Sequence, residues 1–306
     1  MNKNNFYDQE ELCRARFCEA APCWHMCTPE DFPILFNSED DYEGAMEIVA
    51  VCALLHPEIK IYTFDIMSNH LHFVVNGQKS EVEAFFYEIR RCLSYVLKDI
   101  NLPQWECKLF CIDSLEYFRA AVAYCNRNAY VINPLFTPFN YRWGASSLFF
   151  SYELKEYYKN GRKNISVRRR REILHSKRAD GIDGPYTVDG HVSPLSFCFI
   201  EEAEKMFRDA RHYFICITKD VESQKFIANE IGEGIFYTDD ELFSVVVSEC
   251  RKMYGGKKPF ELSAEEKICV AMMMRKDYNS SNKQICRILR LDVDIVNKLF
   301  PLRAKR

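Results

Sequence analysis

Two histidines separated by one residue, His70 and His72, are the first feature of the sequence that could do chemistry. The residues around them alternate as in a β-strand, so both imidazole rings lie on one face and can reach one ion. Two neutral imidazoles and a third polar ligand form an open site for a divalent cation. Taken alone, the pattern is more common on a polar sheet face than in a metal site.

A second pair, Tyr124 and Asn128, lies in an amphipathic segment that begins at Asp113. Their spacing of four places both on one face of a helix, one turn apart. A tyrosine hydroxyl can attack a phosphodiester while Asn128 completes a metal shell. Because the ordinary pKa of tyrosine is about 10, this attack needs a nearby cation or base. The alternative is that Tyr124 packs in the core and Asn128 caps the helix.

The hydrophobic periodicity predicts the elements that would position these residues. We expect strands at 23–28, 59–67, 70–75 and 105–112, and helices at 40–55, 80–100 and 113–128. The resulting order is strand, helix, strand, strand, helix, strand, helix. It predicts an α+β fold in which a ferredoxin-like antiparallel sheet carries helices on one face.

The segment 65–75, with Met67, Asn69, His70, Leu71 and His72, resembles the signature hairpin of the single-tyrosine HUH transposases. The similarity is greatest to the REP-associated tyrosine transposases, and it covers residues 22–150. The other similar segments are Trp24–Met26 (the family's first strand), Leu35–Asp40 (entry to its first helix), Tyr124–Asn128 (its catalytic helix) and Tyr141–Ser147 (its Tyr-x-Trp-Ser-Ser tail). The chain differs in having Ser68 and Ala129 where the family has proline, and in the inserted Gly144-Ala145.

The resemblance implies cleavage and rejoining of single-stranded DNA, usually beside a hairpin. Tyr124 would attack the phosphorus, leaving a 5′-phosphotyrosine link and a free 3′-OH. Mg²⁺ or Mn²⁺ would be held by His70, His72 and Asn128. Tyr117 and Tyr130 are alternative nucleophiles. Two other functions stay open: a non-catalytic DNA-binding regulator with the same fold, and a metal-dependent hydrolase unrelated to DNA.

The formal net charge of −3 conceals two basic blocks. Residues 160–178 carry eight basic side chains against one acidic, and residues 251–306 carry fourteen against six. Beside a nuclease core, the first block is interpreted as a DNA contact through Arg168, Arg169, Arg170 and Arg171. The alternative is a solvated loop.

Residues 262–301 are typical of a helix-turn-helix unit. Ser263 with Glu266 and Ser281 with Gln284 match capping boxes, and Asp292 is placed to cap a third helix. The unit resembles the trihelical DNA-binding domains appended to many bacterial transposases, so duplex DNA is a possible second partner. The candidate contacts are Lys283, Arg287, Arg290, Asn297 and Lys298. A small helical packing domain is the alternative.

The predicted organisation is a nuclease domain at 1–155, a basic linker or loop at 156–196, an acidic helical region at 197–250 and the helix-turn-helix-like domain at 251–306. No apolar window of membrane-spanning length and no signal-peptide pattern is present. We therefore expect a cytoplasmic monomer or homodimer without a membrane partner, and reduced thiols for the 14 cysteines. Cys13, Cys18, Cys23 and Cys27 surround His25 but lack a C-x-x-C pair, which favours core thiols over a zinc site.

Overall fold

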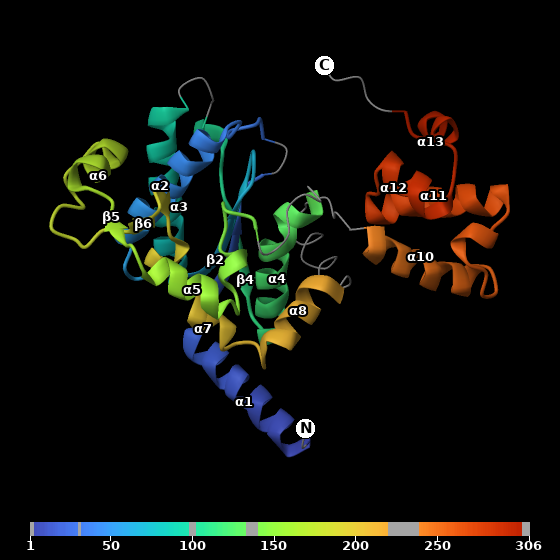
Figure 1. Ribbon diagram of the computed structural model, residues 1–306, viewed down its shortest axis with the longest axis horizontal. Helices are drawn as coiled ribbons and strands as arrows, with labels where there is room; N and C mark the ends of the chain where they lie inside the picture. The colour runs from blue at the N-terminus through green and yellow to red at the C-terminus, as the bar shows by residue number, and fades with distance from the viewer. Residues whose placement is uncertain (1–2, 30–31, 98–101, 133–139, 220–238, 302–306) are drawn as a thin grey trace. The chain divides into compact units, whose positions relative to one another are not determined.

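The computed structural model describes residues 3–29, 32–97, 102–132, 140–219 and 239–301 (Figure 1). The chain divides into two compact units, residues 1–227 and 228–306. The predicted α+β class is confirmed, because helices surround a four-stranded antiparallel sheet in the first unit. Within the described ranges, no helix has the length and apolar character needed to cross a membrane.

The central sheet has the strand order β2-β3-β1-β4, with every neighbouring pair antiparallel. Its strands are β1 (Cys23–Cys27), β2 (Lys60–Ile66), β3 (Leu71–Asn76) and β4 (Lys108–Ile112). The helices between and after them are α2 (Glu39–Leu54), α3 (Lys79–Val96) and α4 (Leu115–Ile132). All seven elements match the strands and helices predicted from the hydrophobic periodicity, with shifts at their ends.

The helices cover both faces of the sheet, so the prediction of helices on one face is wrong. Phe73 of β3 packs its ring 5.7 Å from that of Phe85 of α3, whereas the adjacent His72 packs 5.6 Å from Tyr124 of α4. Because adjacent residues of a strand point to opposite faces, α3 and α4 lie on opposite sides, as Figure 1 shows. The reason is that β2 and β3 are buried on both faces and each face needs a cover.

A helix that the sequence analysis did not anticipate, α1 (Lys3–Ala20), precedes the sheet. It buries Cys13 and Phe17, and the ring of Phe17 lies 5.9 Å from that of Phe118 of α4. Glu10 of α1 binds the guanidinium of Arg119 on α4 at 2.7 Å. The interspersed charges of α1 weaken its apolar periodicity, which explains why its sequence did not indicate a helix.

Much of the predicted linker at 156–196 is folded onto the first unit. It contains the end of α5 (Tyr152–Lys159), α6 (Val167–Leu174) and a small sheet of β5 (Lys163–Asn164), β6 (Tyr186–Val188) and β7 (His191–Val192). It is joined to α2 by an ion pair from Arg169 to Glu47 (2.6 Å) and by a contact between Nδ1 of His191 and the carboxylate of Glu43 (3.0 Å). The helices α7 (Ile200–Glu204) and α8 (Ala210–Lys219) follow in the same unit. The other predicted domain boundaries stay predictions.

The described part of the second unit is helical. It consists of α10 (Asp239–Met253), α11 (Ala264–Tyr278), α12 (Asn282–Leu289) and α13 (Val293–Leu299). The predicted capping boxes at Ser263 and Ser281 are both formed, and the side chain of Asp292 caps α13. The three predicted short helices are therefore confirmed as secondary structure.

Candidate functional site

His70 and His72 lie together at the start of β3, one in the turn and one in the strand. Their ring centroids are 4.9 Å apart and the rings are perpendicular. The exposed fractions of these residues are 4% and 0%, so the pair is enclosed by protein. Nδ1 of His70 lies 2.8 Å from Oδ1 of Asn69, an acceptor that places the ring proton on Nδ1. The lone pair of His70 Nε2 is therefore available to a ligand.

The helix α4 brings both remaining candidates to these histidines. The side-chain amide of Asn128 lies 3.5 Å from His70 Nε2, and the ring of Tyr124 is 5.6 Å from that of His72. A half-turn of the Asn128 amide exchanges its nitrogen for its oxygen, so Oδ1 can occupy the same place. Tyr124 and Asn128 are each 7% exposed. All four residues proposed for catalysis and metal binding thus converge in one buried cluster.

The position of α4 is determined by a buried polar contact on the same face of the sheet. Asn126, between the two candidate residues, hydrogen-bonds through Oδ1 to the hydroxyl of Thr63 on β2. Its Nδ2 donates to the hydroxyl of Tyr213 on α8 at 2.8 Å. Buried polar groups are costly unless paired, so these two bonds specify the register of α4 against β2.

Two further buried residues, His25 and Asp65, lie near the cluster, and the sequence did not predict a role for either of them in the site. His25 of β1 places its Nε2 3.3 Å from Nδ1 of His72. Asp65 of β2 is directly opposite His72 in the β2–β3 pairing, and opposite residues share a face. Burial raises the pKa of Asp65 well above its ordinary value, which favours a neutral carboxyl group. Their proximity depends on strand register, which the sequence alone did not specify.

Burial also keeps the histidines neutral. It lowers the pKa of His70 to about 2, with a further contribution from His72, and lowers the pKa of His72 to about 3. Neutral imidazoles have the lone pair that a metal ligand requires. Among the described residues, no group of three or more His, Cys, Asp or Glu side chains could hold a metal ion. Asn128 is the candidate third ligand, and two imidazoles with one amide oxygen would fit Mn²⁺ better than Mg²⁺.

The structure does not describe the side chains of both alternative nucleophiles predicted from the sequence, Tyr117 and Tyr130. Tyr117 is buried on α4, seven residues and about two helical turns before Tyr124. The side chain of Tyr130 lies outside the described residues. Of the candidates that the structure describes, Tyr124 is the one whose ring contacts those of His25 and His72.

The four arginines of the first basic block that are candidate DNA contacts interact with other groups of the protein. Arg170 is 6% exposed and donates to the carbonyl oxygens of Ala179 and Ile182, so the prediction that it contacts phosphate is wrong. The other three are exposed but form ion pairs: Arg168 with Glu172 (3.0 Å), Arg169 with Glu47 (2.6 Å) and Arg171 with Asp180 (2.6 Å). A phosphate would have to compete with these carboxylates.

The five candidate DNA contacts of the second unit are exposed: Lys283, Arg287, Arg290, Asn297 and Lys298. At least Asn297 and Arg290 also contact other residues of this unit. Oδ1 of Asn297 accepts a hydrogen bond from Nδ2 of Asn282 at 2.8 Å, and Arg290 lies over the ring of Phe260. Lys283 and Lys298 are thus better suited to contact a phosphate without loss of internal packing.

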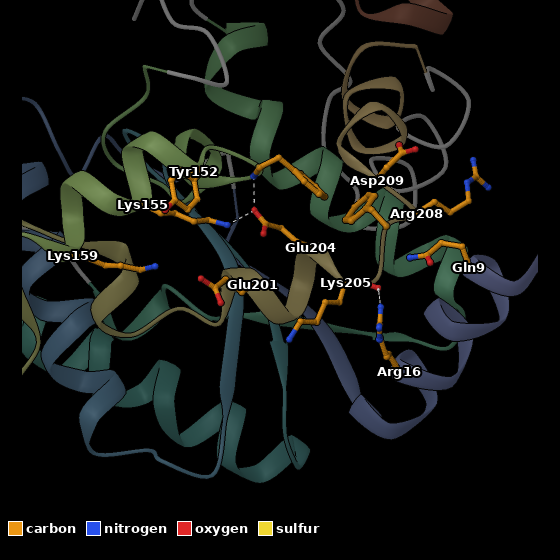
Figure 2. Close-up of a pocket in the computed structure, with 12 residues that line it drawn as sticks. Gln9, Arg16, Tyr152, Lys155, Lys159, Glu201, Glu204, Lys205, Arg208 and Asp209 are labelled. Atoms are coloured by element: carbon orange, nitrogen blue, oxygen red, sulfur yellow. Dashed lines mark hydrogen bonds and ion pairs between the residues drawn. The ribbon is translucent and has the colours of Figure 1, made fainter. Parts of the chain in front are cut away.

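A cavity of about 500 Å³ is lined by residues of α1, α5 and α7 and of the segment after α7, and it shares no lining residue with the histidine cluster (Figure 2). Lys155 binds Glu204 there at 2.6 Å, and the guanidinium of Arg16 donates to the carbonyl oxygen of Lys205. Because both basic and acidic side chains line the cavity, it does not indicate a ligand of one charge.

The histidine cluster combines a hydroxyl nucleophile with a set of neutral nitrogen and oxygen donors, which is the chemistry that metal-assisted phosphoryl transfer requires. In the described residues, these groups come from β3, the turn before it and α4. Comparison of the chain with protein-family models, with curated proteins and with solved structures found no significant match.

Proposed function

We propose that the chain is a metal-dependent endonuclease and strand transferase that cleaves and rejoins single-stranded DNA, beside hairpins, through Tyr124. The observation that supports this most directly is the convergence of Tyr124, His70, His72 and Asn128 in one buried cluster. All four residues belong to segments that resemble the HUH transposase signature. A transposase or a domesticated relative is the corresponding biological role.

The order of the elements supports a ferredoxin-like core for this enzyme. The sequence β1-α2-β2-β3-α3-β4 with strand order β2-β3-β1-β4 places the two central strands next to each other. These central strands carry His25 and His72, and α4 packs on the same face. Tyr124, Asn128 and His72 therefore belong to a helix and a strand, which favours accurate positioning, and His70 lies in the turn before β3.

Each residue has a distinct role in the proposed reaction. The hydroxyl oxygen of Tyr124 forms the bond to phosphorus as the bond to the 3′ oxygen breaks, and the departing 3′-OH can reverse the step. His70, His72 and Asn128 hold Mn²⁺ or Mg²⁺, whose contribution when bound is to neutralise charge on the phosphate. Since the ordinary pKa of tyrosine is about 10, the same charge favours loss of the Tyr124 proton.

The test is a covalent adduct between the full chain and labelled hairpin oligonucleotides in the presence of Mn²⁺. We expect Tyr124→Phe to abolish the adduct and Tyr117→Phe, a buried tyrosine on the same helix, to preserve it. Ala substitution of both His70 and His72 should also abolish the adduct. An undiminished adduct with Tyr124→Phe would refute the assignment of the nucleophile.

A second function, a non-catalytic DNA-binding regulator, is favoured by the burial of Tyr124 at 7% exposure. A phosphodiester reaches this hydroxyl only after the side chains that cover it move. The regulator predicts salt-dependent DNA binding with no adduct at any Mn²⁺ concentration. The enzyme predicts both binding and adduct.

A further inference from the structure

A third histidine contacts the candidate metal site from the neighbouring strand. His25 lies on β1, whose residue Cys27 is opposite His72 in the β1–β3 pairing. Its Nε2 is 3.3 Å from Nδ1 of His72, and its ring centroid is 6.1 Å from that of Tyr124. The residue is fully buried, so solvent does not replace this contact.

The hydrogen bond between the rings of His25 and His72 contains one proton, which lies on one of the two facing nitrogens. Nε2 of His25 and Nδ1 of His72 lie 3.3 Å apart, so one of these nitrogens carries the proton and the other the lone pair. A hydrogen bond between neutral imidazoles has one N–H and one lone pair. Either His72 donates from Nδ1 to His25, or His25 donates from Nε2 to His72.

Metal binding through Nε2 of His72 selects between these two arrangements. A coordinating nitrogen needs its lone pair, so the ring proton of His72 must lie on Nδ1 and point to His25. His70 meets the same requirement through Asn69, whose Oδ1 lies 2.8 Å from Nδ1 of His70. Partners of this kind orient ligating histidines and set which nitrogen binds the metal.

We propose, on the basis of the metal site assigned above, that His25 is a positioning residue that accepts the Nδ1–H of His72 and thereby directs its Nε2 lone pair to the cation. In this arrangement the proton of His25 lies on its Nδ1, which is buried and has no hydrogen-bond partner among the described residues. A buried N–H without a partner is costly. In the opposite arrangement the proton of His72 lies on its Nε2 and occupies the position that the cation needs, so cation binding requires the arrangement in which His72 donates.

Mn²⁺ affinity of the full chain, measured from the electron paramagnetic resonance signal of free Mn²⁺, tests the proposal. We expect His25→Leu, which removes the acceptor, to weaken binding about 10–100-fold. His25→Gln keeps an acceptor at a similar reach and should remain within about threefold of wild type. The matched control is Met26→Ala, a buried neighbour on the opposite face of β1, which should leave affinity unchanged. Wild-type affinity in folded His25→Leu would overturn the proposal.

A second measurement does not depend on a variant. In ¹⁵N-histidine NMR of the wild-type chain with Zn²⁺ as a diamagnetic probe, His72 and His25 should both carry their protons on Nδ1. A loaded protein in which His72 carries its proton on Nε2 would overturn the proposal. If His25→Leu does not fold, His25→Asn replaces it, because its shorter amide does not reach His72 and the same loss of affinity is expected.

The two proposals fail in distinguishable ways. If Mn²⁺ binds equally to wild type and to the His70→Ala/His72→Ala variant, the metal site itself is wrong and the role of His25 falls with it. If that variant loses binding but His25→Leu does not, the metal site stands and only the positioning role is refuted.

Discussion

Asn126 holds α4 to both the sheet and α8, and replacing it tests whether this contact determines the position of Tyr124 and Asn128. The residue is 4% exposed, and its partners Thr63 and Tyr213 are 0% and 1% exposed. Asn126→Leu preserves much of the volume but leaves both hydroxyl groups buried without their partner. Each unsatisfied group costs about 1–3 kcal/mol, so the unfolding free energy should fall by roughly 2–6 kcal/mol.

Tryptophan fluorescence during thermal unfolding measures this loss in the first unit alone, because Trp24, Trp105 and Trp143 all belong to it. At roughly 2–4 °C per kcal/mol for a unit of this size, the midpoint should fall by about 4–24 °C. The same variant should bind Mn²⁺ more weakly than wild type, since a displaced α4 no longer presents Asn128 to His70.

A double-mutant cycle separates the hydrogen bond from general loss of packing. Thr63→Val removes the hydroxyl and keeps the shape of the side chain, so the double variant should be less destabilised than the sum of the single variants. We expect a coupling free energy of about 1 kcal/mol. A fall of less than about 2 °C in Asn126→Leu with no coupling to Thr63→Val would refute the assigned role of the contact.

Three further predictions follow from buried and exposed charges. Arg170→Ala removes a buried guanidinium from two carbonyl oxygens and should lower the unfolding free energy by about 2–4 kcal/mol in urea titrations. The control, Arg168→Ala, removes an exposed side chain and should change the unfolding free energy by less than about 0.5 kcal/mol. Equal effects of the two substitutions would contradict the burial of Arg170. Hydrogen bonding to Arg119 lowers the pKa of Glu10 below 4.5, so its carboxylate stabilises the fold above that pH and the contribution disappears as pH falls through the lower folded-state pKa. Glu10→Gln should accordingly be less stable than wild type at pH 7, with a difference that shrinks in unfolding curves recorded below pH 4.5; a constant difference would exclude this linkage. If the second unit binds duplex DNA, joint Ala substitution of Lys283 and Lys298 should reduce the slope of log affinity against log salt by about 1.8, and an unchanged slope would argue for a packing domain.

Local structure was largely predictable from neighbouring residues. The capping boxes at Ser263 and Ser281 formed as expected because their partners lie three residues away, within reach of the same helical turn. The strand that includes His72 was also predictable, because strand periodicity depends on residues that are close together in the chain. The small sheet at 163–192 was not predicted, since its strands are two or three residues long and carry no measurable periodicity.

The histidine pair and its relation to Tyr124 and Asn128 could be proposed from type and spacing, but their contact could not. Asn128 lies 58 residues from His70 and His25 lies 47 from His72, so these distances depend on strand order and on which face α4 covers. The run of arginines shows the same limit: four identical side chains look equivalent in sequence, and only the fold supplies Arg170 with buried carbonyl acceptors. The sequence by itself determined the elements and the chemical groups available, because helices, strands and caps depend on residues close in the chain. Tertiary structure decided which groups meet and which are buried, because those interactions depend on segments that are distant in sequence and are brought together only by packing.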